Sequence, residues 1–212
     1  MRWFKKKDSF KTADWNDITL EKYYKIVELL QVQDEYTALN IIDLVYGVNG
    51  EDIPITELKK YKIDFISKQI PHKDKVPSKL TINGHKYSID VELTKVSATQ
   101  YVDFCNYTQG KDIKYEDALS VFIIPSGHAY NDGYDISLVK KDIMELSMVD
   151  IATISQFFFL QFKLFAAIFQ VYLSSQLKEM QKTATPEVKV KIEKILEELA
   201  EVDLQSSVAS LI

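Results

Sequence analysis

The 212-residue sequence predicts a mainly α protein (α+β), built as a helical bundle around a long Phe-rich central helix with one small β-hairpin. Apolar residues recur at helical spacing through most of the chain. One pair of strand-like segments flanks an Asn-Gly dipeptide, which suits a tight hairpin turn. A 26-residue segment, 148–173, has 19 apolar residues and six of the eleven Phe.

Three helices are predicted within an N-terminal helical subdomain, residues 14–70. The first covers about 18–32, where Leu and Tyr recur on one face. Asp34 is expected to cap the second helix, and Gly47 to end it in a left-handed conformation. A third, shorter helix is expected over 57–69.

Residues 71–79 are expected to link this subdomain to residues 80–212, which combine the hairpin, further helices and a C-terminal helical hairpin. Leu80–Ile82 and Lys86–Ile89 are the predicted strands. A two-stranded hairpin is too small to be stable alone, so it must pack on helices or on a partner.

Shorter helices are predicted after the hairpin. Ser97 is expected to cap one that closes near Gly110, and another covers about 114–123. The longest polar loop is 125–135, after which Asp135 caps a helix over 136–146.

The segment 148–173 is long enough to raise the question of a membrane span. Lys163 lies at its centre, and inserting a central Lys costs roughly 2.5–3.5 kcal/mol. Gln156, Lys163 and Gln170 are spaced by seven, so they form one polar stripe on a helix that is otherwise apolar. A buried helix is therefore favoured over a membrane span. The stripe is expected to bond within its own bundle or across the seam of a homo-oligomer.

The C-terminal part predicts an antiparallel helical hairpin formed by 149–183 and 187–202. Thr185-Pro186 marks the start of the last helix, because Pro is tolerated at the first helical position.

The N-terminal arm, residues 1–13, is basic. It carries a net charge of +4, against −5 for the whole chain, and aromatic residues interleave with its cations. Such an arm stays solvated, or docks on an acidic surface, a phosphate or a membrane. Its candidate interaction residues are Trp3, Phe4, Lys5, Lys6 and Lys7.

No catalytic, metal or cofactor motif is found, and we expect neither enzymatic activity nor a cofactor. His72, His85 and His128 lie far apart without ligand spacing, so each is interpreted as a loop or strand-surface histidine. The single Cys105 excludes a disulfide scaffold and is interpreted as a small buried hydrophobe. The overall acidity argues against a general nucleic-acid binder.

Three stretches carry a family resemblance: DWNDITL at 14–20, KLTINGHKYSIDVELTKVSATQYVDF at 79–104, and MELSMVDIATISQFF at 144–158. Together they resemble small proteins encoded among the virion and tail-assembly genes of tailed bacteriophages, particularly crAss-like phages. The resemblance spans about 14–180 and defines no active site.

The resemblance implies a virion-associated structural or cargo protein that binds other tail or portal-region proteins. It would be assembled in the cytoplasm of the bacterial host and located in the virion. The basic arm could then contact an acidic lumen or packaged DNA. The alternatives are a tail-assembly chaperone that binds the tape-measure protein, and a membrane-active protein that inserts 157–173.

Overall fold

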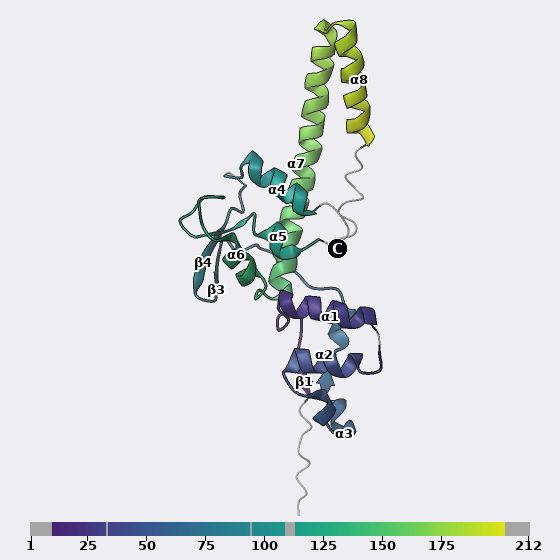
Figure 1. Ribbon diagram of the computed structural model, residues 1–212, viewed down its shortest axis with the longest axis vertical. Coiled ribbons are helices and arrows are strands. Elements are labelled where there is room, and N and C mark those ends of the chain that lie inside the picture. The colour runs from purple at the N-terminus through teal and green to yellow at the C-terminus, as the bar shows by residue number, and fades with distance from the viewer. Residues whose placement is uncertain (1–9, 33, 94, 109–112, 202–212) are drawn as a thin grey trace, which may run out of the picture. The chain divides into compact units, whose positions relative to one another are not determined.

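The computed structural model describes residues 10–32, 34–93, 95–108 and 113–201, without the side chains of 165–170 and 198–201. Within these residues the fold is mainly α with short strands in small sheets, which confirms the predicted fold class (Figure 1). The chain divides into two compact units, Met1–Ile154 and Ser155–Ile212. The elements are β1 (Lys11–Thr12), α1 (Leu20–Val32), α2 (Thr37–Tyr46), a 3-10 turn (Gly50–Asp52), α3 (Ile55–Leu58), β2 (Tyr61–Lys62), a 3-10 turn (Asp64–Ser67), β3 (Lys79–Ile82), β4 (His85–Ile89), α4 (Ala98–Thr108), α5 (Tyr115–Leu119), β5 (Ile123–Pro125), α6 (Ile136–Ile143), α7 (Met148–Thr183) and α8 (Pro186–Glu201).

The first two predicted helices are confirmed as α1 and α2. Gly47 ends α2 with φ of 63°, and its N–H donates to the carbonyl of Asp43 at 2.8 Å. Asp34 acts in the preceding turn, where its carboxylate accepts from the Tyr36 N–H and the Thr37 hydroxyl. The predicted C-terminal glycine of α2 is therefore confirmed, whereas the predicted Asp34 cap is wrong: the N-cap is Tyr36, which makes no side-chain cap bond, and Asp34 lies two residues earlier.

The predicted helix over 57–69 is wrong. α3 ends at Leu58, and the next residues form β2, which pairs in parallel with β1. Phe65 follows in a 3-10 turn and packs edge-on against Trp15, with ring centroids 5.3 Å apart. Leu58, Tyr61 and Phe65 are spaced as on one helix, but they lie in three separate elements. Pairing with the N-terminal strand overrides the helical pattern.

The hairpin is confirmed as β3 and β4, with both turn residues at positive φ, 51° at Asn83 and 84° at Gly84.

The prediction of a helix over 114–123 is wrong at its end, because α5 stops at Leu119. Ile123–Pro125 form β5, a third antiparallel strand beside β4. Residues 121–123 are all buried, and a short apolar run does not distinguish strand from helix by periodicity.

The predicted caps of α4 and α6 are confirmed. Ser97 and Gln100 form a reciprocal capping box, in which the Ser97 hydroxyl accepts from the Gln100 N–H and the Gln100 side chain accepts from the Ser97 N–H. Asp135 accepts from the N–H groups of Ser137 and Leu138. α6 ends at Ile143, three residues before the predicted end.

The core of the first unit lies where the helices meet the three-stranded sheet. Tyr87 and Ile89 from β4 are buried there, as is Ile143 from α6. The fully buried large side chains of this unit are Tyr87, Ile18, Leu20, Ile26, Leu119, Ile123, Ile143, Met148, Ile151, Ile154 and Val121.

In the second unit α7 and α8 run side by side in opposite directions, which confirms the predicted helical hairpin (Figure 1). α7 is one unbroken helix from Met148 to Thr183. Ile192 of α8 is buried, and the Gln181 amide donates to the Glu193 carboxylate at 3.0 Å across the pair.

Candidate functional site

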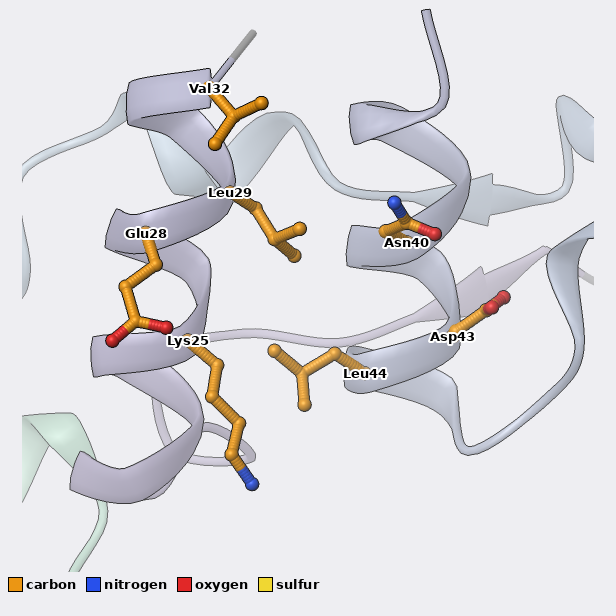
Figure 2. A pocket seen from close by; sticks show the side chains of 7 residues that line it. All are labelled: Lys25, Glu28, Leu29, Val32, Asn40, Asp43 and Leu44. Carbon is orange, nitrogen blue, oxygen red and sulfur yellow. The ribbon is translucent and has the colours of Figure 1, made fainter. Parts of the chain in front are cut away.

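A groove of about 690 Å³ lies between α1 and α2. Figure 2 shows Leu29 of α1 and Leu44 of α2 extending into the space between the helices, with Val32 at the end of α1. Val32 is 71% exposed, so the groove has an apolar floor open to solvent. We call it the α1–α2 groove, and its lining residues are Lys25, Glu28, Leu29, Val32, Asn40, Asp43 and Leu44.

The lining of the α1–α2 groove carries charges of both signs. Glu28 is exposed and has no hydrogen-bond or ion-pair partner among the described residues, whereas Lys25 pairs with Glu21 at 2.6 Å. That pairing also lowers the pKa of the Glu21 carboxyl, through the Lys25 hydrogen bond first and its charge second. Asp43 accepts from the Gly50 N–H, and in Figure 2 its carboxylate points away from the space between the helices.

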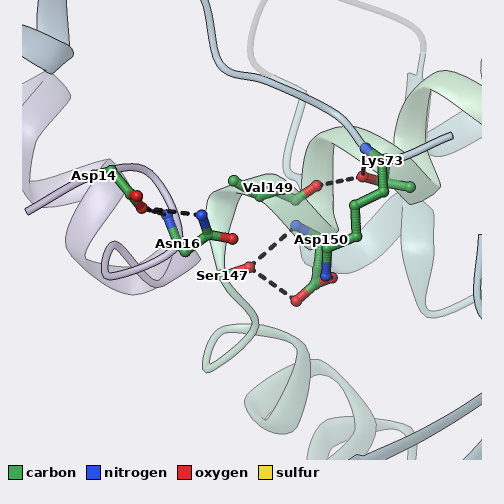
Figure 3. Close-up of polar contacts among 7 residues, drawn as sticks. Asp14, Asn16, Lys73, Ser147, Val149 and Asp150 are labelled. Carbon is green, nitrogen blue, oxygen red and sulfur yellow. Dashed lines mark hydrogen bonds and ion pairs between the residues drawn. The ribbon is translucent and has the colours of Figure 1, made fainter.

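A second cluster of polar contacts fixes the start of α7. Ser147 and Asp150 cap the helix, since the Ser147 hydroxyl accepts from the Asp150 N–H at 3.1 Å and donates to its carboxylate at 2.8 Å (Figure 3). Lys73 pairs with Asp150 at 2.5 Å, and its N–H donates to Thr153. The predicted linker is thus held against the first turns of α7.

Asp142, the next-to-last residue of α6, is 2% exposed and bonds three other side chains. Its Oδ1 accepts from the Asn83 amide at 3.0 Å. Its Oδ2 lies 2.7 Å from Nδ1 of His85 and accepts from the Tyr87 hydroxyl at 2.5 Å. One carboxylate therefore joins α6 to the hairpin turn and to β4.

The protonation of this network follows from its geometry. Burial alone would raise the pKa of Asp142, but the hydrogen bonds from Tyr87, Asn83 and His85 outweigh it and hold the pKa below its ordinary value. Burial, followed by the hydrogen bond to Asp142, raises the pKa of Tyr87. The carboxylate is therefore the stable form, and Tyr87 remains a donor to it.

A depression of about 500 Å³ lies beside the network, lined by His85, His128, Tyr134 and apolar residues of α6 and β5. The Asp142 carboxylate orients the His85 imidazole, which is half-exposed, an arrangement that can support proton transfer. His85 was predicted on a strand surface, and its partner Asp142 was not predicted. The available signal was the alternation of Asn83, His85 and Tyr87, which places three polar side chains on one face.

In α7 two opposite faces are apolar. Phe158 and Phe162 are buried, at 0% and 8% exposure. Leu160, Leu164 and Val171 are exposed by 49%, 57% and 72%, and their spacing places them within an arc of about 40° on the other face. Within the single chain, the described part of α7 is therefore buried on one face only.

The predicted interaction residues have different outcomes. Gln156 and Lys163 are half-buried and lie beside the exposed leucine face, where solvent reaches them. The side chain of Gln170 lies outside the described residues, as do Trp3, Phe4, Lys5, Lys6 and Lys7.

Among the described residues, no group of three or more His, Cys, Asp or Glu side chains could hold a metal ion. None of the described helices combines the length and apolar character needed to cross a membrane. Cys105 is half-buried, and burial raises the pKa of its thiol.

Comparisons of the chain with protein-family models, with curated proteins and with solved structures each give no match.

Proposed function

We propose that this chain is a non-catalytic structural or cargo protein of a bacteriophage particle, which binds other virion proteins through the α7–α8 hairpin. The observation that carries the proposal is the second apolar face of α7. Leu160 and Leu164 are exposed although the opposite face of the same helix is already buried. Exposed apolar faces of this kind are typical of protein-binding surfaces. The phage setting is supported by the resemblance of 14–20, 79–104 and 144–158 described above.

Further exposed apolar residues lie on several faces of both hairpin helices. Burying several such side chains against a partner provides about 25 cal/mol per Å² of apolar area, before the cost of association. The exposed set on the hairpin is Leu160, Leu164, Val171, Tyr172, Met180, Val188, Val190 and Ile195.

The test follows the protein by mass spectrometry through purification of the particles of the phage that encodes it. We expect it to copurify with intact particles. Replacing Leu160 and Leu164 together by Glu should lower its incorporation at least about tenfold, the effect of about 1.4 kcal/mol in binding. Ile55→Glu is the matched control, because Ile55 is 87% exposed on α3 of the other unit.

The same experiment separates the alternatives. A protein bound to a tail component in the infected cell but absent from mature particles would be a tail-assembly chaperone instead. A protein absent from particles and from complexes with phage proteins would overturn the proposal.

A further inference from the structure

The His85 imidazole lies between the buried carboxylate of Asp142 and an open depression. Its Nδ1 is 2.7 Å from Oδ2 of Asp142, whose side chain is 3% exposed, whereas the His85 side chain is 50% exposed. His85 also lines the depression of about 500 Å³ beside α6. One ring nitrogen is therefore held at the protein interior, and the other, Nε2, belongs to the exposed part of the ring.

The Asp142 carboxylate selects one tautomer of the neutral imidazole. Hydrogen bonds from Tyr87 and Asn83 hold this carboxylate in its ionised form, so it accepts a proton from Nδ1 of His85 and has none to donate. With the proton on Nδ1, the lone pair of the ring is on Nε2. Nε2 has no hydrogen-bond partner among the residues that the structure describes, so its lone pair is available as a nucleophile.

The depression around the ring suits an uncharged group. Pro125, Leu138 and Val139 give it apolar walls. Asp135 also lines it, and the carboxylate of Asp142 lies behind the ring. Carboxylates at both places repel a phosphoryl dianion, whereas they do not repel a neutral acyl group. The lining therefore favours acyl over phosphoryl chemistry.

We propose that His85 is an acyl-acceptor site, at which Nε2 takes an acyl group from an uncharged activated ester or thioester. Nε2 attacks the carbonyl carbon, a C–N bond forms, and the bond from that carbon to the leaving oxygen or sulfur breaks. The ring then carries a positive charge, which the Asp142 carboxylate stabilises. The Nδ1 proton passes through water to the leaving group, which departs as an alcohol or thiol. The site is separate from the apolar surface of the α7–α8 hairpin and does not depend on the proposed function.

His128 supplies a matched comparison inside the same depression. Its Nδ1 is 3.6 Å from the Asp132 carboxylate, too far for a hydrogen bond, and the Asp132 side chain is 61% exposed. His72 is an exposed residue outside the depression. Within the described chain neither ring contacts a buried carboxylate, so neither should share the reactivity of His85.

The test treats the full chain with short pulses of diethyl pyrocarbonate, an uncharged acyl donor, at about pH 8, where an ordinary imidazole is neutral. Mass spectrometry of the peptides gives a rate constant for each of the three histidines. We expect His85 to react at least about tenfold faster than His128 and His72, because its tautomer is fixed and its product cation is stabilised. Phosphoramidate, a phosphoryl donor, should show no preference for His85.

Two variants separate the orientation of the ring from its exposure. In Asp142→Asn the amide can donate to Nδ1, which moves the proton to Nε2, and the His85 rate should fall to that of His128. In Tyr87→Phe the contact between Nδ1 and Asp142 remains, so the His85 rate should stay high. NMR of the imidazole nitrogens reports the tautomer directly, and thermal unfolding verifies that each variant is folded at the assay temperature.

Four results would overturn the proposal. The first is a His85 rate no higher than that of His128 in the parent chain. The second is an unchanged His85 rate in folded Asp142→Asn, which would make the carboxylate irrelevant. The third is an NMR spectrum of the parent chain that places the proton on Nε2. The fourth is preferential phosphorylation of His85 by phosphoramidate, which would contradict the assigned acyl class.

Discussion

Asp142 links elements that are distant in the sequence. A buried carboxylate is stable only where donors replace the water that it loses. Here Asn83, His85 and Tyr87, all from one hairpin, surround a residue of α6. The side chain therefore contributes to the docking of α6 on the three-stranded sheet.

Asp142→Asn should lower the free energy of unfolding by about 2 kcal/mol or more at neutral pH, because charged hydrogen bonds are lost. The folded pKa of Asp142 lies below the ordinary value of 3.8, so its stabilisation is complete above that pH and is lost as the pH falls through the folded pKa. Urea unfolding at several pH values should show the difference between parent and variant shrinking in acid. Tyr87→Phe removes one donor and should lower the free energy of unfolding by less. If Asp142→Asn were as stable as the parent chain at neutral pH, the stabilising role of the Asp142 carboxylate would be contradicted.

Position 50 requires glycine, because neighbouring atoms of α2 leave no room for a Cβ atom. A Cβ atom at this position would lie 2.6 Å from the Asp43 carboxylate oxygen and 3.0 Å from the Leu39 carbonyl. Gly50→Ala should therefore cost about 1–3 kcal/mol, as overpacking does. Thermal unfolding measures the loss. In an Asp43→Ala background the added cost should be smaller, because one of the two clashes is gone; strictly additive effects would refute the steric explanation.

At the residue scale, the roles that could be predicted from the sequence are those with local chemistry. Gly47 and Asn83 adopt positive φ in tight turns, and Ser97 and Asp135 accept from backbone N–H groups within three residues, so their neighbours in sequence reveal these roles. Asp142 was missed because its donors lie 55 to 59 residues away, where no local pattern reports them.

At the element scale, α7 combines a buried face and an exposed one. Phe158→Ala should lower the free energy of unfolding by about 3–5 kcal/mol, since the ring is fully buried. Leu164→Ala removes an exposed side chain and should change it by less than about 0.5 kcal/mol. Chemical denaturation of both variants tests this. Equal losses would mean that Leu164 is buried in the protein in solution.

The elements that were predicted correctly have strong periodicity or caps of their own. α1, α2 and the α7–α8 hairpin are of this kind. β2 and β5 were missed because each depends on a partner strand elsewhere in the chain, β1 for the first and β4 for the second. The exposed face of α7 was missed for a related reason, since apolar composition does not reveal which side of a helix is covered.

At the scale of the whole molecule, the predicted N-terminal subdomain and the hairpin region lie in one compact unit. Backbone hydrogen bonds join them, from Leu20 N–H to the Leu146 carbonyl at 3.0 Å and from Met148 N–H to the Ile18 carbonyl at 2.7 Å. The Tyr24 hydroxyl also donates to Glu116 at 2.7 Å, and burial, the largest cause, raises the pKa of Tyr24.

These links predict that residues 14–70 and 80–154 unfold together. Native-state hydrogen exchange should give the helices α1 and α6 the same opening free energy, as expected for one cooperative unit. Lys73→Ala, which removes the ion pair to Asp150, should lower both values equally. Protection that falls in only one of the two segments would mean that they are independent.

We expect the Asn83-Gly84 turn also to set an order of events during folding. A hairpin with a tight turn forms within about 1–10 μs, and it brings Asn83, His85 and Tyr87 onto one edge before α6 arrives. Asp142 comes from 55 or more positions further along the chain, so its docking is a late step. The Asp142→Asn substitution should then accelerate unfolding much more than it slows refolding in stopped-flow experiments. The Asp142 side chain would thus determine how long the native state lasts rather than how quickly it is reached.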